Sequence, residues 1–438
     1  MTAKDRISRR KFLSGSAGAA AGAIGFPLIV PSSVLGGGGA VAPSERITMG
    51  CIGVGWQGGS NMDAFLREKD CRVVAVCDVD KNHLDEAKNR VNQQYKNNDC
   101  ATYGDFRELI ARDDIDAVSL GLPDHWHSIP AVAAARSGKD IFGEKPLSHN
   151  LREGRAMCDA VERYGRIWQT GSWQRSQENF RQACEIVRNG RIGKIHTVEV
   201  GLPSGHTDFG GTKGQEGITA PPGQLDYDFW LGPAPYEPYC PARVHKNWRW
   251  HLDYGGGQLM DWIGHHVDIA HWGLDFDRTG PSEIDGTGEF PRDGLWNTAG
   301  KYRLTAKYPN GIIMTIAGGH GDIRDGTKWI GPDGWVWVTR GKIDAEPKSL
   351  LEEKFGPNDI HLFRSPGHQR NFLDCVKSRK ETLTPCETAH RSATPGHLGA
   401  IAMKLGRKIR FNPQTEEIIN DATAASLLGR PMRAPWHL

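Results

Sequence analysis

In this 438-residue sequence, an aspartate and a histidine four residues apart have the types and spacing to carry out acid–base chemistry. Asp261 and His265 lie in Gln258–Trp272, a largely apolar run after three glycines that predicts a helix. Side chains four residues apart lie on one face of a helix, so both would point to one site. An imidazole can take up a proton near neutral pH and return it, which suits His265 to the role of a base.

Two other roles stay open for this helix, metal binding and packing in the core. They concern His265, His266, Asp268 and His271. The spacing differs from the H-E-x-x-H zinc motif, and we interpret His266 and His271 as structural.

A lysine before a proline is the third reactive group. Lys145 stands in Glu144-Lys145-Pro146, directly after the predicted strand Asp140–Gly143. A residue before proline is restricted to extended conformations, so Lys145 would be held at a fixed angle at the end of a strand. Its ammonium could stabilise a developing alkoxide or relay a proton, and the alternative is a solvated surface lysine.

A glycine motif predicts the loop that binds a dinucleotide. Gly53, Gly55 and Gly58 have G-x-G-x-x-G spacing between the apolar run Arg46–Ile52 and the amphipathic stretch Asn61–Arg67. The first glycine permits a tight turn, the second lets a pyrophosphate approach the backbone, and the third lets helix pack on strand. The phosphates then meet the free N–H groups of the helix N-terminus. The alternative is a glycine turn in an unrelated α/β domain.

An acidic residue after the next strand favours NAD as the cofactor. Strand Arg72–Cys77 ends in Asp78, twenty residues past Gly58. A carboxylate there accepts hydrogen bonds from the ribose hydroxyls of NAD and would repel the 2′-phosphate of NADP. Lys81 is close enough to help bind a phosphate, so NADP stays possible.

Alternating strands and helices predict an α/β fold, with a doubly wound parallel Rossmann sheet over residues 43–171. Residues 172–438 predict an α+β domain with a largely antiparallel open sheet, because they contain two hairpins. The hairpins are Lys301–Tyr308 with Gly311–Ala317, and Lys328–Ile330 with Gly334–Thr339. Leu202–Arg249, rich in Gly and Pro, is too long for a plain connection and predicts an ordered lid or substrate loop. We expect the tail Phe411–Leu438 to pack back on the first domain.

Four features together resemble the Gfo/Idh/MocA oxidoreductases, the family of glucose-fructose oxidoreductase and inositol dehydrogenase. They are the glycine motif, Asp78, Leu122–His127 and Gly138–Leu147. The resemblance covers nearly everything from Arg46 onward. It implies that Lys145 lies beside the nicotinamide and the substrate hydroxyl, that the Lys145–Pro146 peptide is often cis, and that relatives are often dimers or tetramers that pair the open sheet face.

The resemblance also implies roles for the other site residues. Asp261 and His265 contact the substrate, and His265 removes the hydroxyl proton while hydride leaves for the nicotinamide. We expect cofactor contacts from Gly53, Gly55, Trp56, Gln57, Gly58, Asp78, Pro123, His127, Glu144 and Lys145. His125 and His127 could also bind a metal, but no partner set completes a site, so we expect none.

Tryptophans favour a carbohydrate substrate. The sequence has 14, and several lie in segments that should surround the substrate. An indole face can lie against the C–H groups of a sugar ring while polar neighbours bind its hydroxyls, although most of these residues could simply fill the core. The expected substrate contacts are Trp173, Arg175, Trp230, Trp248 and Trp262.

The first 42 residues predict export. Ser8–Leu13 matches a twin-arginine signal, the Gly/Ala-rich stretch Ser14–Val30 follows it, and Ala40-Val41-Ala42 is a cleavage site, so we expect periplasmic localisation through the Tat machinery. The alternative is an uncleaved membrane anchor, for which Phe12–Val30 is barely long enough. The net charge of +2 has no basic cluster beyond this segment, which argues against nucleic acid. The nine cysteines suit a core better than a disulfide framework.

Three functions follow in order of preference. The first is an exported NAD(P)-dependent oxidoreductase that acts on a sugar, glycoside or polyol and carries a tightly bound cofactor. The second is a glycoside hydrolase or lyase that oxidises C3 transiently, with no net redox change. The third is a nucleotide-bound binding protein without turnover.

Overall fold

The computed structural model describes residues 41–438. The chain divides into two units: Met1–Arg46, of which the structure describes only residues 41–46, and the compact unit Ile47–Leu438. The described part of the first unit contains one short 3-10 turn, Pro43–Glu45. The predicted twin-arginine signal lies in residues 1–40, outside the described residues. No helix within residues 41–438 has the length and apolar character needed to span a membrane. Everything below concerns Ile47–Leu438.

The first sheet confirms the predicted parallel Rossmann fold. Its six parallel strands have the order β3-β2-β1-β4-β5-β6, so the strand order reverses between β1 and β4. Ligands of such sheets bind at that reversal, outside the carboxyl ends of the strands. The strands are β1 Ile47–Ile52, β2 Cys71–Cys77, β3 Ala101–Tyr103, β4 Ala117–Leu120, β5 Asp140–Gly143 and β6 Trp168–Thr170. The helices are α2 Trp56–Leu66, α3 Lys81–Tyr95, α4 Phe106–Ile110, α5 Ser128–Arg136 and α6 Leu151–Arg163.

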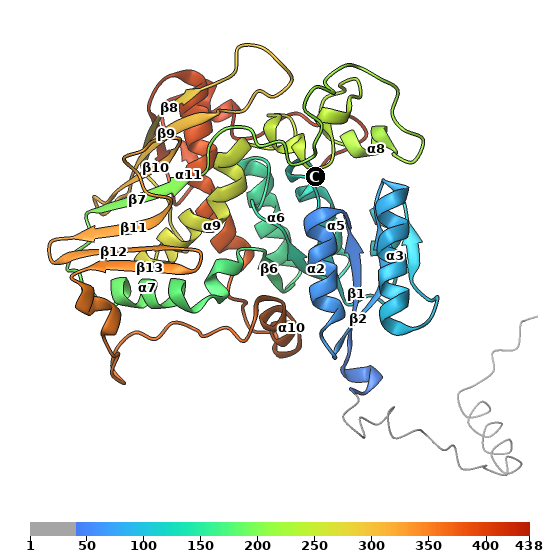
Figure 1. Ribbon diagram of the computed structural model, residues 1–438, viewed down its shortest axis with the longest axis horizontal. Coiled ribbons are helices and arrows are strands. Elements are labelled where there is room, and N and C mark those ends of the chain that lie inside the picture. The colour runs from blue at the N-terminus through green and yellow to red at the C-terminus, as the bar shows by residue number, and fades with distance from the viewer. Residues whose placement is uncertain (1–40) are drawn as a thin grey trace, which may run out of the picture. The chain divides into compact units, whose positions relative to one another are not determined.

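The second sheet has nine strands in the order β13-β12-β11-β7-β10-β9-β8-β14-β15. Neighbours are antiparallel except β7 and β10, which confirms the predicted, mostly antiparallel sheet and both hairpins. The strands are β7 Thr197–Leu202, β8 Glu283–Glu289, β9 Lys301–Lys307, β10 Ile313–Gly318, β11 Gly326–Gly331, β12 Gly334–Thr339, β13 Lys342–Glu346, β14 Ile409–Asn412 and β15 Glu417–Ile418. Helices α7 Glu178–Arg188, α9 Gly257–Leu274 and α11 Cys386–Leu405 pack against it (Figure 1).

A helix from the C-terminal part of the chain completes the core of the first domain. Helix α10, His368–Ser378, places Phe372 against Phe65 and Phe142, with ring centroids 6.0 and 5.8 Å apart. In Figure 1, α10 lies next to the blue elements of the first sheet. The last residues also return to this domain, where Trp436 packs on Trp126 with ring centroids 4.7 Å apart.

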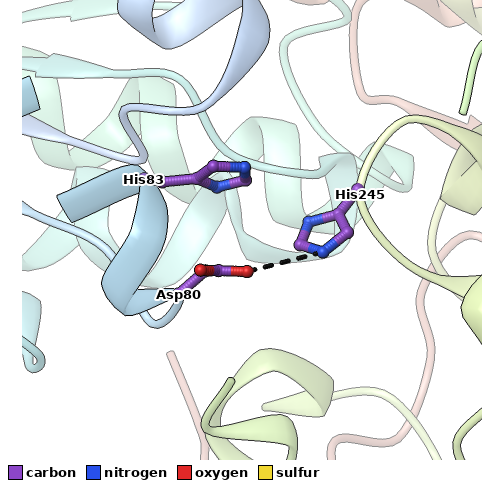
Figure 2. A group of neighbouring side chains, drawn as sticks. All are labelled: Asp80, His83 and His245. Carbon is purple, nitrogen blue, oxygen red and sulfur yellow. Dashed lines mark ion pairs between the residues drawn. The ribbon is translucent and has the colours of Figure 1, made fainter. Parts of the chain in front are cut away.

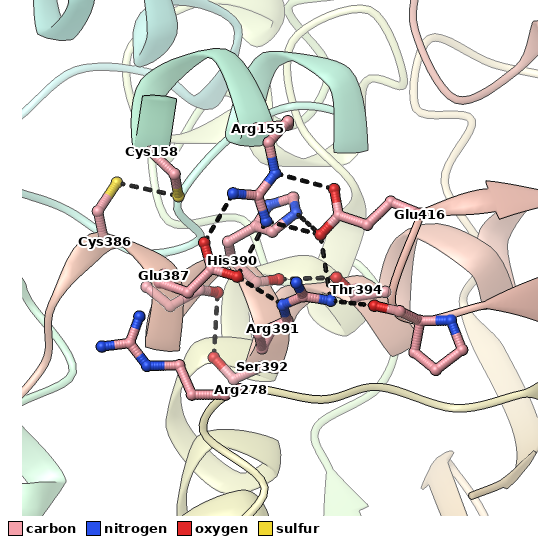
Figure 3. Close-up of polar contacts among 12 residues, drawn as sticks. Arg155, Cys158, Arg278, Cys386, Glu387, His390, Arg391, Ser392, Thr394 and Glu416 are labelled. Carbon is pink, nitrogen blue, oxygen red and sulfur yellow. Dashed lines mark hydrogen bonds and ion pairs between the residues drawn. The ribbon is translucent and has the colours of Figure 1, made fainter. Parts of the chain in front are cut away.

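A network of ion pairs joins α6 of the first domain to α11 (Figure 3). Arg155 pairs with Glu387 at 2.8 Å and with Glu416 at 2.7 Å, and His390 contacts Glu416 at 2.9 Å. Beside it, the sulfurs of Cys158 and Cys386 lie 3.4 Å apart. All nine cysteines are buried and none forms a disulfide, as the core interpretation predicts.

The predicted segment Leu202–Arg249 is ordered; its first residue ends β7, and we call residues 203–256 the lid. The lid contains helix α8, Tyr227–Leu231, and 3-10 turns at Pro241–Arg243 and Asn247–Trp250. Its apolar side chains form a small core of their own, which includes Trp230, Trp248 and Tyr254. A β-bridge between Leu225 and Asp80 ties the lid to the first domain.

Buried histidines make the fold sensitive to acid. Burial lowers the pKa to about 3 for His125, His266, His271 and His397. In the unfolded chain the pKa of these groups is near 6.5, so below pH 6.5 the unfolded state binds protons that the folded state excludes. Above pH 6.5 these histidines cost the folded state nothing. Below pH 6.5 the free energy of unfolding decreases steadily as the pH falls toward 3.

The acid sensitivity can be measured in denaturant titrations. One histidine of this kind costs about 2 kcal/mol at pH 5. We therefore expect the free energy of unfolding to fall by at least that amount between pH 7.5 and pH 5. An equal free energy at both pH values would contradict this.

Candidate active site

One cavity of about 480 Å³ lies where the carboxyl ends of the first sheet, helix α9 and the lid meet. A volume of this size is typical of small-molecule and cofactor sites. Fourteen of the residues predicted for the site line it: Gly53, Gly55, Trp56, Gln57, Asp78, Pro123, Glu144, Lys145, Trp173, Trp230, Trp248, Asp261, Trp262 and His265. Gly58, His127 and Arg175 are not among its lining residues.

The glycine loop forms the nucleotide end of the cavity. Gly53 has a φ of +74°, which glycine adopts at little cost. A Cβ on Gly58 would lie 1.8 Å from the carbonyl oxygen of Gly53, so the third glycine lets α2 pack on the loop. Helix α2 begins at Trp56, inside the motif and five residues before the predicted start at Asn61. Its N-cap, Gly55, supplies no side-chain cap, so the first N–H groups of α2 are left for a ligand.

Asp78 supports this loop. Its Oδ2 accepts a hydrogen bond from the backbone N–H of Val54 at 2.9 Å, and its Oδ1 accepts one from Asp80 N–H at 2.9 Å. Each carboxylate oxygen can accept a further hydrogen bond, so Asp78 can also bind a ribose hydroxyl. Asp78 lies 3.8 Å from the Nδ1 of His83 and, as the main cause, raises the pKa of that imidazole. The uncapped helix, the glycines and this carboxylate fit a dinucleotide.

Two histidines and an aspartate gather at the same end (Figure 2). His83 belongs to α3, His245 to the lid, and Asp80 caps α3 by accepting a hydrogen bond from Asn82 N–H. The Nε2 of His245 lies 3.5 Å from Oδ2 of Asp80. The ligand atoms of the three residues lie within 4.8 Å of one another, so the group could hold a metal ion. It also lines the cavity, so a metal would share this space with a nucleotide.

The loop after β4 does not use His127 as the sequence predicts. The Nδ1 of His127 lies 2.8 Å from the carbonyl oxygen of Pro146 and its Nε2 lies 2.9 Å from that of Leu122. These contacts hold the loop after β4 against the segment that contains Lys145. The Nε2 of His125 likewise contacts the carbonyl oxygen of Trp230. His127 therefore has a positioning role in this structure and does not reach the cavity.

Lys145 and Asp261 meet at the other end of the cavity. The Nζ of Lys145 donates to the backbone oxygen and to Oδ1 of Asp261, both at 2.8 Å. The Nε of Arg249 donates to the same Oδ1 at 3.1 Å. Burial alone would raise the pKa of Asp261, but the two cations outweigh it and lower the pKa below its usual value. Asp261 is therefore a carboxylate at neutral pH. The Lys145–Pro146 peptide is cis.

His265 lies one turn after Asp261 and is buried, with 4% of its surface exposed. Its Nδ1 has no hydrogen-bond partner within residues 41–438. Burial, followed by the charges of Lys145 and Arg340, lowers its pKa well below the usual value. The imidazole is therefore neutral at pH 7, which is the form that accepts a proton.

Arg175 does not reach the cavity, contrary to the sequence prediction. Its guanidinium pairs with Asp268 and with Asp277, both at 2.7 Å, and the residue is 2% exposed. The carboxylates of Asp268, in α9, and of Asp277, which follows α9, thus hold Arg175 in the core. Asp268 is paired with Arg175, and the Nε2 of His271 contacts the hydroxyl of Tyr308 at 2.6 Å. Two of the four residues considered for a metal site on α9 are therefore engaged in other contacts.

Two family models match the chain. One is the oxidoreductase family, NAD-binding Rossmann fold, over residues 47–172, and the other is the oxidoreductase family, C-terminal alpha/beta domain, over residues 176–438. The chain belongs to the Gfo/Idh/MocA oxidoreductase family. Its cofactor-binding part is therefore the NAD-binding Rossmann domain of this family.

Named relatives of the Gfo/Idh/MocA chain cover only part of it. It is 32% identical over 152 residues to a myo-inositol 2-dehydrogenase of Thermotoga maritima. That alignment covers 35% of this chain and 44% of the relative. It is 30% identical over 175 residues to a glycosyl hydrolase family 109 protein of Shewanella baltica. That alignment covers 36% of this chain and 37% of the relative. The alignments thus cover less than half of these relatives.

Solved structures share the Gfo/Idh/MocA fold over most of the chain. The WlbA dehydrogenase from Bordetella pertussis, solved with NADH and UDP-GlcNAcA, has a TM-score of 0.63 and 17% identity, covering 84% of this chain and 98% of that one. An aldose-aldose oxidoreductase from Caulobacter crescentus has a TM-score of 0.59 and 19% identity, covering 84% and 100%. At these identities the likeness is one of fold.

Five charged residues that line the cavity of this Gfo/Idh/MocA chain were not predicted from the sequence: Asp80, Asp124, Lys246, Arg249 and Arg340. Arg249 lies between two indoles, with its Cζ 4.9 Å from the ring centroid of Trp56 and 4.4 Å from that of Trp248. Asp124 stands inside the Leu122–His127 segment but carries no motif signal of its own. Arg340 occupies a hairpin turn, where an arginine is ordinarily a solvated surface residue.

Proposed function

We propose that the protein is an exported NAD(P)-dependent oxidoreductase that transfers hydride between a hydroxyl-bearing carbon of a sugar, glycoside or polyol and a tightly bound nicotinamide cofactor. One observation carries this proposal. Lys145 from the first domain and His265 from the second line the same cavity as the glycine loop. The myo-inositol 2-dehydrogenase relative supports a dehydrogenase, and Asp78 supports NAD over NADP.

The cavity residues divide the chemistry among them. A bound nicotinamide would supply the hydride acceptor. The neutral imidazole of His265 takes the hydroxyl proton, and the Nζ of Lys145 stabilises the negative charge that develops on the substrate oxygen. Asp261, a carboxylate held by Lys145 and Arg249, orients the substrate by accepting a hydrogen bond from a hydroxyl. Trp230 and Trp248 contribute to the apolar lining of the cavity beside the substrate.

The pH profile tests the role of His265. Its pKa is lowered by burial, so deprotonation is complete at lower pH than for a free imidazole. We expect kcat/KM for cofactor reduction to be level above pH 6.5 and to fall about tenfold per pH unit below a midpoint under 6.5. The exposed H361Q variant should keep this profile and H265N should lose its midpoint. A return to pH 7.5 after each assay separates titration from acid unfolding. A midpoint above pH 7 would contradict the assignment.

Native mass spectrometry tests the bound cofactor. Because no pool of free NAD is expected in the periplasm, the cofactor should travel and turn over while bound. We expect protein purified from the exported fraction to retain a mass that matches NAD or NADP. Protein from that fraction without such a mass would contradict both tight binding and carriage through export.

A second function has its own support. Curated relatives carry the names glycosyl hydrolase family 109 protein and alpha-N-acetylgalactosaminidase. In that case transient oxidation at C3 allows elimination of the glycosidic substituent, and the product is then reduced again. Product analysis separates the two: this function cleaves aryl glycosides with no net cofactor reduction, whereas the first reduces the cofactor without cleavage.

A further inference from the structure

Arg340 stands at a tight turn beside the catalytic residues. It occupies the two-residue turn between β12 and β13, where Thr339 pairs with Lys342 and Gly341 has a φ of +71°. It lines the cavity together with Lys145, Asp261 and His265. The turn therefore delivers one arginine from the second sheet to the catalytic end.

Two indoles hold the guanidinium of Arg340. Its Cζ lies 4.5 Å from the ring centroid of Trp173 and 4.5 Å from that of Trp262. Trp262 is also stacked on His266, with ring centroids 5.7 Å apart and an interplanar angle of 14°. Trp262 therefore offers an edge to the cavity, whereas a sugar would need a free ring face. The guanidinium is left with its in-plane N–H groups, which form the fork that matches a carboxylate.

Within residues 41–438, these N–H groups have no protein acceptor. Arg340 forms no hydrogen bond and no ion pair in this part of the chain, although the negative charges of Asp261 and Asp325 act on it through space. Asp261 is bonded instead to Lys145 and Arg249. Arg340 is an exposed residue whose guanidinium lies against two indole rings, and its N–H groups are available to a ligand.

Arg340 is a cation at the catalytic end that has no carboxylate partner within residues 41–438. Lys145, Arg249 and Arg340 are cations, and Asp261 is the carboxylate paired with two of them. Burial raises the pKa of Asp124 well above its usual value, which favours its neutral acid, and His265 is neutral. An anionic group on the ligand would give Arg340 the partner that Lys145 and Arg249 have in Asp261.

We infer that the substrate is an acidic sugar, a uronic acid or a glycoside of one, whose carboxylate is bound by the in-plane N–H groups of Arg340. This inference rests on the proposed function and names its substrate class. Arg340 would thus determine specificity, while Lys145 and His265 act at the reacting carbon.

Matched sugars test the inference. Glucose and galactose are compared with glucuronate and galacturonate, and with their 6-phosphates, by thermal-shift affinity and by cofactor reduction. The variants are R340Q, R340K and the control R324Q. Arg324 also stacks on an indole, 3.2 Å from the Trp337 centroid, but it pairs with Asp344 and does not line the cavity.

We expect the wild type and R324Q to bind a uronate at least tenfold more tightly than the matched neutral sugar. A hydrogen-bonded charge pair of this kind is consistent with a preference of about 10- to 100-fold, which R340Q should abolish and R340K should reduce. Equal affinity for uronate and neutral sugar in the wild type, an unchanged preference in R340Q, or a preference for the 6-phosphate would overturn the inference. If no sugar reduces the cofactor but the uronate preference depends on Arg340, the proposed function fails while the inference about the ligand stands.

Discussion

Replacement of Lys145 by alanine is expected to lower kcat/KM by about 10³-fold while the cofactor stays bound. The ammonium is the donor placed at the substrate oxygen, and it is fixed by two hydrogen bonds to Asp261 at 2.8 Å. Steady-state cofactor reduction measures the loss, and the nucleotide released on denaturation measures cofactor content.

The matched control for this variant is K328A. Lys328 pairs with Glu199 on the second sheet at 3.7 Å and does not line the cavity. Activity in K145A equal to that in K328A would remove the catalytic assignment. The third function, nucleotide binding without turnover, would be preferred if neither the wild type nor K328A reduced the cofactor with any sugar.

The second large effect is expected from G58A. The added Cβ would lie 1.8 Å from the carbonyl oxygen of Gly53 and 3.3 Å from the Cα of Gly121. Both neighbours are backbone atoms, which cannot move aside as a flexible side chain can. We expect the variant to lose about 3 kcal/mol or more of stability, together with its cofactor.

Gly104 provides the control for G58A. It lines the same cavity, but a Cβ there would meet nothing within 4 Å, so G104A should unfold close to the wild-type temperature. Thermal denaturation and nucleotide content are measured for both variants. A G58A protein within about 1 kcal/mol of G104A would show that the third glycine is not needed for packing.

The parts of the site that sequence alone predicts are those carried by local patterns. The glycine loop and Asp78 depend on a strand followed by a helix, and Lys145 and the Asp261–His265 pair depend on neighbours within a few residues. In each of these cases the chemistry and the backbone that holds it are encoded in the same short stretch.

The parts that sequence misses depend on partners far away in the chain. Arg175 looked available for a substrate because its partner Asp268 lies 93 positions later. Strand β8, with the sequence Glu-Ile-Asp-Gly-Thr-Gly-Glu, has one buried apolar residue, Ile284, and forms because β9 and β14 pair with it. The guanidinium of Arg340 lies against Trp173 and Trp262, which come from two other elements, so its position in the cavity could not be predicted from its neighbours in sequence.

The contribution of α10 to the first domain affects how the protein is made. Phe372, Leu373 and Val376 share one apolar cluster with Met49 and Phe65 of the nucleotide-binding half. During synthesis that half leaves the ribosome long before these three side chains are added, so it waits with part of its apolar surface uncovered. We therefore expect stable capture of a nucleotide to be a late event, after most of the nascent chain has emerged.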